Sequence, residues 1–87
     1  MFSSIDEVRG VLSRVVDKIT DANGGLEAAI ANLEAARADL AMAMQGSDQA
    51  DVGSAYAAIM AALAALGEAR SMAMACSQET EGVSARL

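Results

Sequence analysis

The stretch "MQGSDQADVG", residues 44–53, is the one place where this alanine-rich chain stops reading as helix. It can be a linker, a ligand-binding loop or the bend of a hairpin. Gly46 stands where the C-terminal cap of a helix favours a residue that tolerates a positive φ. Ser47 and Asp48 can each cap a following helix, and Asp51 places negative charge where the helix dipole favours it. The end of the first helix, the connection and the start of the second helix fall within about six residues. This short spacing predicts the bend of an antiparallel hairpin over residues 46–50.

The ligand-loop interpretation is the weaker one. A calcium loop of the EF-hand type needs oxygen ligands at alternating positions over about twelve residues, ending in a glutamate. The stretch holds only two aspartates and a serine. No metal site is therefore expected at the bend.

The composition predicts an all-α fold in a single domain, residues 1–87. The chain has no proline, and alanine, the best helix former, dominates its 54% of apolar residues. Valine and isoleucine recur every three or four residues and never alternate in twos, as a half-buried strand would require.

The first helix is predicted from about residue 4 to about residue 45. Ser4 and Glu7 have the spacing of a capping box. The Gly24-Gly25 pair leaves the apolar register unchanged, so a continuous helix with a kink there is preferred over a break. The register residues are Ile5, Val8, Leu12, Val15, Ile19, Ala22, Leu26, Ala29, Leu33, Ala36, Leu40 and Ala43.

The second helix is predicted from about residue 51 to about residue 82. It keeps the same seven-residue repeat, and alanine alternates with larger residues along much of both registers. Alanine at every second position lets two helices approach to an axial distance of about 8 Å. The register residues are Val52, Ala55, Ile59, Ala62, Leu66, Ala69, Ala73, Cys76, Thr80, Val83 and Leu87.

One hairpin of this kind is not expected to stand alone. Two helices of about 40 residues form a rod about 60 Å long, and a chain this small buries little apolar area. Apolar residues also lie off the predicted register, which indicates a second interface and a four-helix assembly with another copy or a different hairpin. The predicted interface is centred on Tyr56, Met60 and Leu63, with Val16, Ile30 and Met44.

The chain lacks the residues of most catalytic sites. It has no histidine, which excludes histidine acid–base catalysis and Ser-His or Cys-His nucleophiles, and its glycines form no phosphate loop. No enzymatic activity and no cofactor are expected.

The net charge of −6 and the scattered basic residues argue against nucleic acid and anionic membrane surfaces as partners. The most apolar stretch, Val52–Gly67, is mostly alanine and falls short of the roughly 20 residues of a membrane span.

The stretch "SMAMACSQ", residues 71–78, offers soft ligands. Met72 and Cys76 are four residues apart and can share a soft ion such as copper(I). Cys76 lies on the predicted register, so packing between the helices is preferred, and a soft-metal site or an intermolecular disulfide is kept as a minor option. We expect synthesis in the cytoplasm, with export without a cleaved signal left open.

A short, acidic hairpin with a glycine-containing bend resembles the WxG-motif helical hairpins of type VII secretion. The sequence "MQGSD" has Gly46 where the family has its Trp-x-Gly glycine, but no tryptophan. The family's export signal pairs a tyrosine with an acidic residue four positions on, whereas Tyr56 is followed there by Met60. The resemblance implies a partner that is a second hairpin or the helical domain of a secreted effector.

Two hypotheses for the function follow. The first is a non-enzymatic interaction module, a chaperone-like accessory of a type VII secretion substrate. The second is a self-assembling homodimeric or tetrameric helical bundle.

Overall fold

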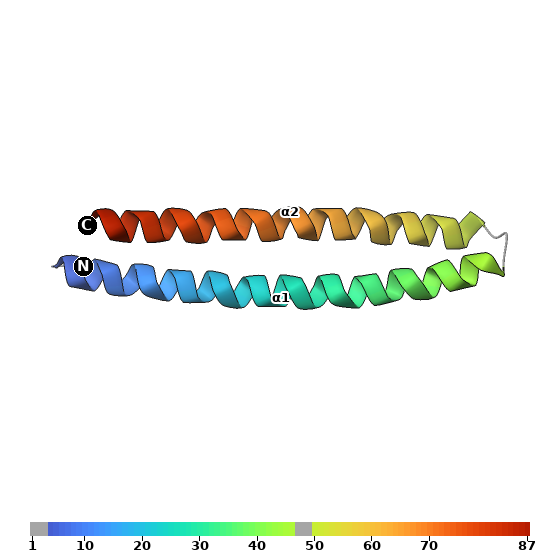
Figure 1. Ribbon diagram of the computed structural model, residues 1–87, viewed down its shortest axis with the longest axis horizontal. Coiled ribbons are helices and arrows are strands. Elements are labelled where there is room, and N and C mark those ends of the chain that lie inside the picture. Colours follow the sequence, from blue (N-terminus) through green and yellow to red (C-terminus); the bar gives the residue numbers. More distant parts are fainter. Residues whose placement is uncertain (1–3, 47–49) are drawn as a thin grey trace.

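The computed structural model describes residues 4–46 and 50–87, which form two long helices, α1 (Ile5–Gln45) and α2 (Ala50–Arg86). The helices run antiparallel and side by side, so that the start of α1 and the end of α2 lie at the same end of the molecule (Figure 1). No described residue belongs to a strand. The predicted all-α hairpin is confirmed, although α2 continues beyond the predicted end near residue 82 to Arg86.

The N-terminus of α1 is capped as the sequence predicts. Ser4 is extended, with φ −147° and ψ 158°, and its hydroxyl accepts a hydrogen bond from the Glu7 amide at 3.1 Å. Asp6 and Glu7 place negative charge in the first turn, where the helix dipole favours it. The cap therefore fixes the point at which the rod begins.

The C-terminus of α1 differs from the prediction in one respect. Gly46 caps the helix with a negative φ of −104°, and its amide donates to the Ala43 carbonyl at 3.2 Å. The expected positive φ is wrong, because a tightened last turn satisfies the terminal carbonyl without a left-handed residue. Ser47 and Asp48, the other predicted bend residues, lie outside the described residues.

Helix α1 passes through Gly24-Gly25 without interruption. Figure 1 shows α1 bowed gently along its length, with no sharp bend at the glycine pair. Gentle curvature is usual for a long helix packed on one side. The preferred interpretation of a continuous helix is confirmed, and the expected kink is no more than part of this gradual curve.

The hairpin is a thin rod without a core. It measures 65 × 19 × 14 Å and has a radius of gyration of 19.6 Å, against about 12 Å for a compact chain of 87 residues. No side chain among the described residues is buried. The accessible surface of 6071 Å² exceeds by about 1,300 Å² that of a compact protein of 8.8 kDa.

The contact between the helices follows a seven-residue repeat. At two positions of each heptad, four residues apart, nearly every side chain is half-buried, and these positions lie along the contact between the helices. We call these the contact positions. They are Leu12, Val16, Ile19, Asn23, Leu26, Ile30, Leu33, Arg37 and Leu40 in α1, and Val52, Tyr56, Ile59, Leu63, Leu66, Ala73, Ser77, Thr80 and Ser84 in α2.

The contact positions correct the register predicted from the sequence. One half of that register, such as Leu26 and Ile59, faces the other helix as expected. In some heptads of the other half, the next residue along the chain takes the predicted place, as Val16 does for Val15. In others both are half-buried, as Ala29 and Ile30 are, and Ala69 keeps the place while Arg70 is exposed. The physical reason for the shift is size, since it covers Ile30, Tyr56 and Leu63 as well as alanine and removes more apolar area from water.

Candidate interaction surface

One broad side of the hairpin carries two open grooves between the helices. The first, of about 440 Å³, is lined by Ser13 of α1 and Glu81 of α2 among others. The second, of about 370 Å³, is lined by Thr20, Glu27 and Met74 among others. Each of these residues directly follows a contact position such as Leu12 or Ala73. The same position of the heptad therefore faces this side of the hairpin in both helices. We call this side the groove face: Ser13, Thr20, Glu27, Glu34 and Ala41 with Gly53, Met60, Gly67, Met74 and Glu81.

The opposite side of the hairpin is apolar throughout. Successive helical residues are about 100° apart. Counted from the first contact position of a heptad, such as Leu12, the next residue and the residue three further on therefore lie on opposite sides of the contact. The residues three after therefore share the side away from the grooves. We call this side the alanine face: Val15, Ala22, Ala29, Ala36 and Ala43 of α1 with Ala55, Ala62, Ala69, Cys76 and Val83 of α2.

The alanine face is partly open to solvent and carries no charged side chain. Val15 is 37% exposed, and Ala22, Ala43, Ala55 and Cys76 are exposed as well. The other members are half-buried beside the contact positions: Ala29, Ala36, Ala62, Ala69 and Val83. The face extends along most of the 65 Å rod. It is an apolar surface that the hairpin covers only in part.

Polar groups between the helices are few. The Arg37 guanidinium donates to the Met60 sulfur at 3.9 Å, which places these two residues level with each other along the rod. The side-chain oxygen of Asn23 is buried without a hydrogen-bond partner. An unpaired polar atom costs free energy, so the contact inside the hairpin is imperfect as well as narrow.

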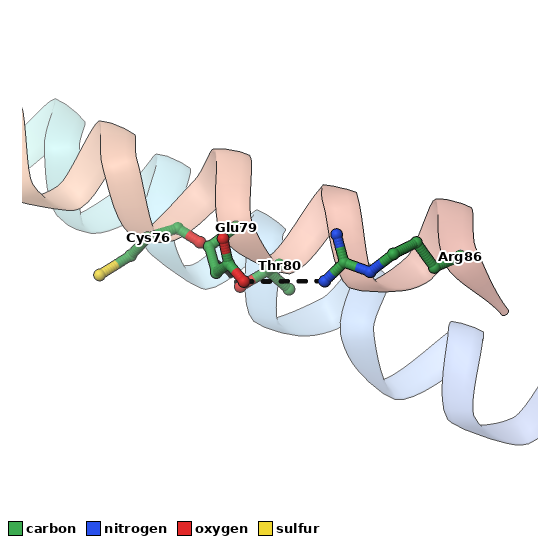
Figure 2. A network of polar contacts seen from close by, with 4 residues as sticks. All are labelled: Cys76, Glu79, Thr80 and Arg86. Atoms are coloured by element: carbon green, nitrogen blue, oxygen red, sulfur yellow. Dashed lines mark hydrogen bonds and ion pairs between the residues drawn. The ribbon is translucent and has the colours of Figure 1, made fainter.

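The remaining polar contacts lie within single helices. The Thr20 and Thr80 hydroxyls donate to the carbonyl oxygens of Val16 and Cys76, at 3.0 and 2.8 Å. Near the end of α2, Arg86 pairs with Glu79 at 3.7 Å, and both side chains are well exposed (Figure 2). An exposed ion pair of this kind contributes little to stability, so Arg86 can exchange Glu79 for another carboxylate at little cost.

The structure separates the residues of the predicted second interface. Val16, Ile30, Tyr56 and Leu63 are contact positions, half-buried within the hairpin. The side chains that stay exposed are Met60, at 41%, and Met44, at 40%. A second interface that includes all six residues stays a prediction.

The soft-ligand stretch lies on the surface. Cys76 is a free, exposed cysteine (Figure 2), so its expected packing between the helices is wrong; Ser77 takes the contact position instead. Met72 is 63% exposed. The described residues include no group of three or more His, Cys, Asp or Glu side chains placed to hold a metal, and a soft-ion site at Met72 and Cys76 stays a prediction.

By length and composition alone, α2 is apolar enough to cross a membrane. Its most apolar window of 18 residues has a mean hydropathy of 1.5 and is not buried within the hairpin. Much of this hydropathy comes from alanine, as in the sequence "AAIMAALAAL", residues 57–66. The same exposed surface is available to a membrane or to a protein.

No protein family, curated protein or solved structure matches this chain. Its function is therefore inferred from its own surface.

Proposed function

We propose that this chain is a non-enzymatic protein–protein interaction module, a helical hairpin that completes a four-helix bundle with a second helical hairpin. The observation that supports this most is the absence of any buried side chain among the described residues. A standard interface buries about 800 Å² on each partner. The excess surface of this hairpin, about 1,300 Å² relative to a compact protein of its mass, is enough for such an interface.

The exposed apolar side chains support the same proposal. Met42, Met60, Met72 and Met74 are between 41% and 71% exposed. Methionine is flexible and polarizable, so it packs against surfaces of different shape. Such a surface suits a partner made of helices, whose ridges of side chains vary along their length.

The resemblance to WxG-motif hairpins supplies a candidate setting. In that setting the chain is a chaperone-like accessory in type VII secretion, and its partner is the helical domain of a secreted effector. The length of the chain and its hairpin layout support this proposal. In this setting the chain would fold in the cytoplasm.

A second candidate function is self-assembly into a structural helical bundle. It is favoured by the alanine face, which carries no charge and repeats with the same seven-residue period on both helices. Two copies with a net charge of −6 each can bring this face together without burying like charges.

A protein partner is preferred over a membrane because of α1. Helix α1 packs along α2 and carries charged side chains over its whole length, from Asp6 to Asp39. Inserting α2 into a bilayer would require either separating the helices or drawing these charges into hydrocarbon, which is costly. Nucleic acid is not proposed, because the basic residues gather on no single face.

Thermal unfolding at several protein concentrations tests the proposed function. A chain stabilised by association has a midpoint that rises with its own concentration, or with that of an added partner hairpin. The candidate partner to add is the product of a neighbouring gene, if its sequence predicts a helical hairpin. A cooperative transition whose midpoint responds to neither concentration would contradict the proposal.

A further inference from the structure

We infer that the alanine face binds the alanine face of a second copy of this chain, with the two bends at opposite ends of the bundle. The inference rests on the proposed function and names its partner. It arises from three features of the described residues: the apolar face itself, the sizes of the side chains along it, and the charges at its rim.

The face allows close packing over a long distance. Alanine side chains let helix axes approach to about 8 Å, and no charged or polar group has to be desolvated on the face. A second hairpin of the same length covers the rod from end to end. The hairpin as a whole exposes about 1,300 Å² more than a compact protein of its mass, and an interface of roughly 800 Å² per partner would remove much of this excess.

The sequence of the face is complementary to itself. A two-fold axis through Ala29 of α1 sets Val15 against the partner's Ala43, and Ala22 against the partner's Ala36. On α2, an axis through Ala69 sets Val83 against the partner's Ala55 and Cys76 against the partner's Ala62. Each side chain larger than alanine thus meets an alanine.

The two axis positions coincide in the hairpin. Arg37 lies level with Met60; Ala29 is eight residues before Arg37, and Ala69 is nine residues after Met60. Ala29 and Ala69 therefore lie at about the same level along the rod. A single two-fold axis perpendicular to the rod serves both helices.

The charges at the rim select the same axis independently. Exposed charged residues border the alanine face along the outer edge of each helix. They include Lys18 and Asp39 on α1, and Asp51 and Arg86 on α2. The midpoint between the first two lies beside residue 29, and that between the second two beside residue 69. The axis brings Lys18 to the partner's Asp39 and Asp51 to the partner's Arg86. Opposite charges then meet four times in each dimer, which fixes orientation.

The alternative, with both bends at one end, fits less well. It places α1 of one copy on α2 of the other, so that Lys18 meets the partner's Glu79. Asp39 then meets the partner's Ala58, and Val15 meets the partner's Val83. Opposite charges meet twice rather than four times, and the two valines are set against each other.

A cysteine at the axis tests this arrangement directly. In a Cys76→Ser background, Ala29→Cys places two thiols across the two-fold axis, where Cα atoms about 4.4–6.8 Å apart allow a disulfide. Mild oxidation is expected to convert most of the chain to a covalent dimer without changing its native mass. The matched control, Ala31→Cys in the same background, lies on the outer side of α1 and is expected to stay uncrosslinked.

Other outcomes of that experiment would overturn the inference. Failure of the Ala29→Cys chain to crosslink excludes the proposed axis. A mixed disulfide between Ala29→Cys and Ala69→Cys chains would show that the bends lie at the same end.

Charge substitutions provide a test without cysteine. Ala29→Glu sets two carboxylates against each other at the axis and is expected to raise the dimer dissociation constant about 100-fold or more, whereas Ala31→Glu leaves it unchanged. Lys18→Glu is expected to weaken the dimer about tenfold, and adding Asp39→Lys to that variant restores it. A native mass that is the same in all four variants would contradict the inference.

Failure of the inference can be told apart from failure of the proposed function. A chain that is monomeric alone but binds a different helical hairpin overturns the inference and leaves the proposed function standing. A monomer whose unfolding responds to no partner contradicts both.

Discussion

Gly24 lies in the middle of α1, and a Cβ atom added there would meet nothing within 4 Å. Each glycine within a helix costs about 1 kcal/mol relative to alanine, through the freedom it retains in the unfolded chain. We expect Gly24→Ala to raise the free energy of unfolding by about 1 kcal/mol and the midpoint of thermal unfolding by several degrees. The measurement is circular dichroism during heating.

Gly82→Ala is the control for this prediction. There the added Cβ would lie 3.3 Å from a terminal nitrogen of Arg86, so that the arginine must move and the gain is smaller. A loss of stability in Gly24→Ala would mean that α1 does not run as a continuous helix through this point.

At the scale of the helices, the sequence predicts which elements form but not how they are rotated. The seven-residue repeat predicts two long helices and their antiparallel contact, and these are confirmed, although α2 ends at Arg86 and not near residue 82. The same period fits two neighbouring sets of positions. One set contains Val15 and Cys76, the other contains Val16 and Ser77, and both sets repeat every seven residues. The choice between the two sets depends on how much apolar area each rotation of the helices buries against the other helix. The period of the sequence carries no information about that area.

The rotation changes what a substitution at Leu63 should do. Leu63 is half-buried against α1, so Leu63→Asp places a charge in the contact inside the hairpin. We expect a loss of about 3 kcal/mol or more and with it much of the helical signal at 222 nm. Ala64→Asp, one residue away on the exposed side of α2, is the control and should keep its helicity. Equal helicity in both variants would place Leu63 outside the contact.

For the molecule as a whole, the sequence predicts the thin rod better than it predicts which residues lie on each side of the rod. Length and composition indicate a rod too thin to hold a core, and no described side chain is buried. The alanine face was not predictable from spacing alone, because Ala29 and Ala62 belong to the repeat that favoured them as contact positions. The rotation of the helices leaves these residues half-buried at the edge of the contact and gathers them on one side.

Native mass by size-exclusion chromatography with light scattering, on the chain alone over a range of concentrations, tests the central claim most directly. The chain has a mass of 8.8 kDa. If the hairpin completes its core with a second copy, a single species of twice that mass should persist down to low concentration. A monomer at every concentration, with a cooperative unfolding transition that no partner shifts, would show that the hairpin needs no second hairpin and would contradict the claim.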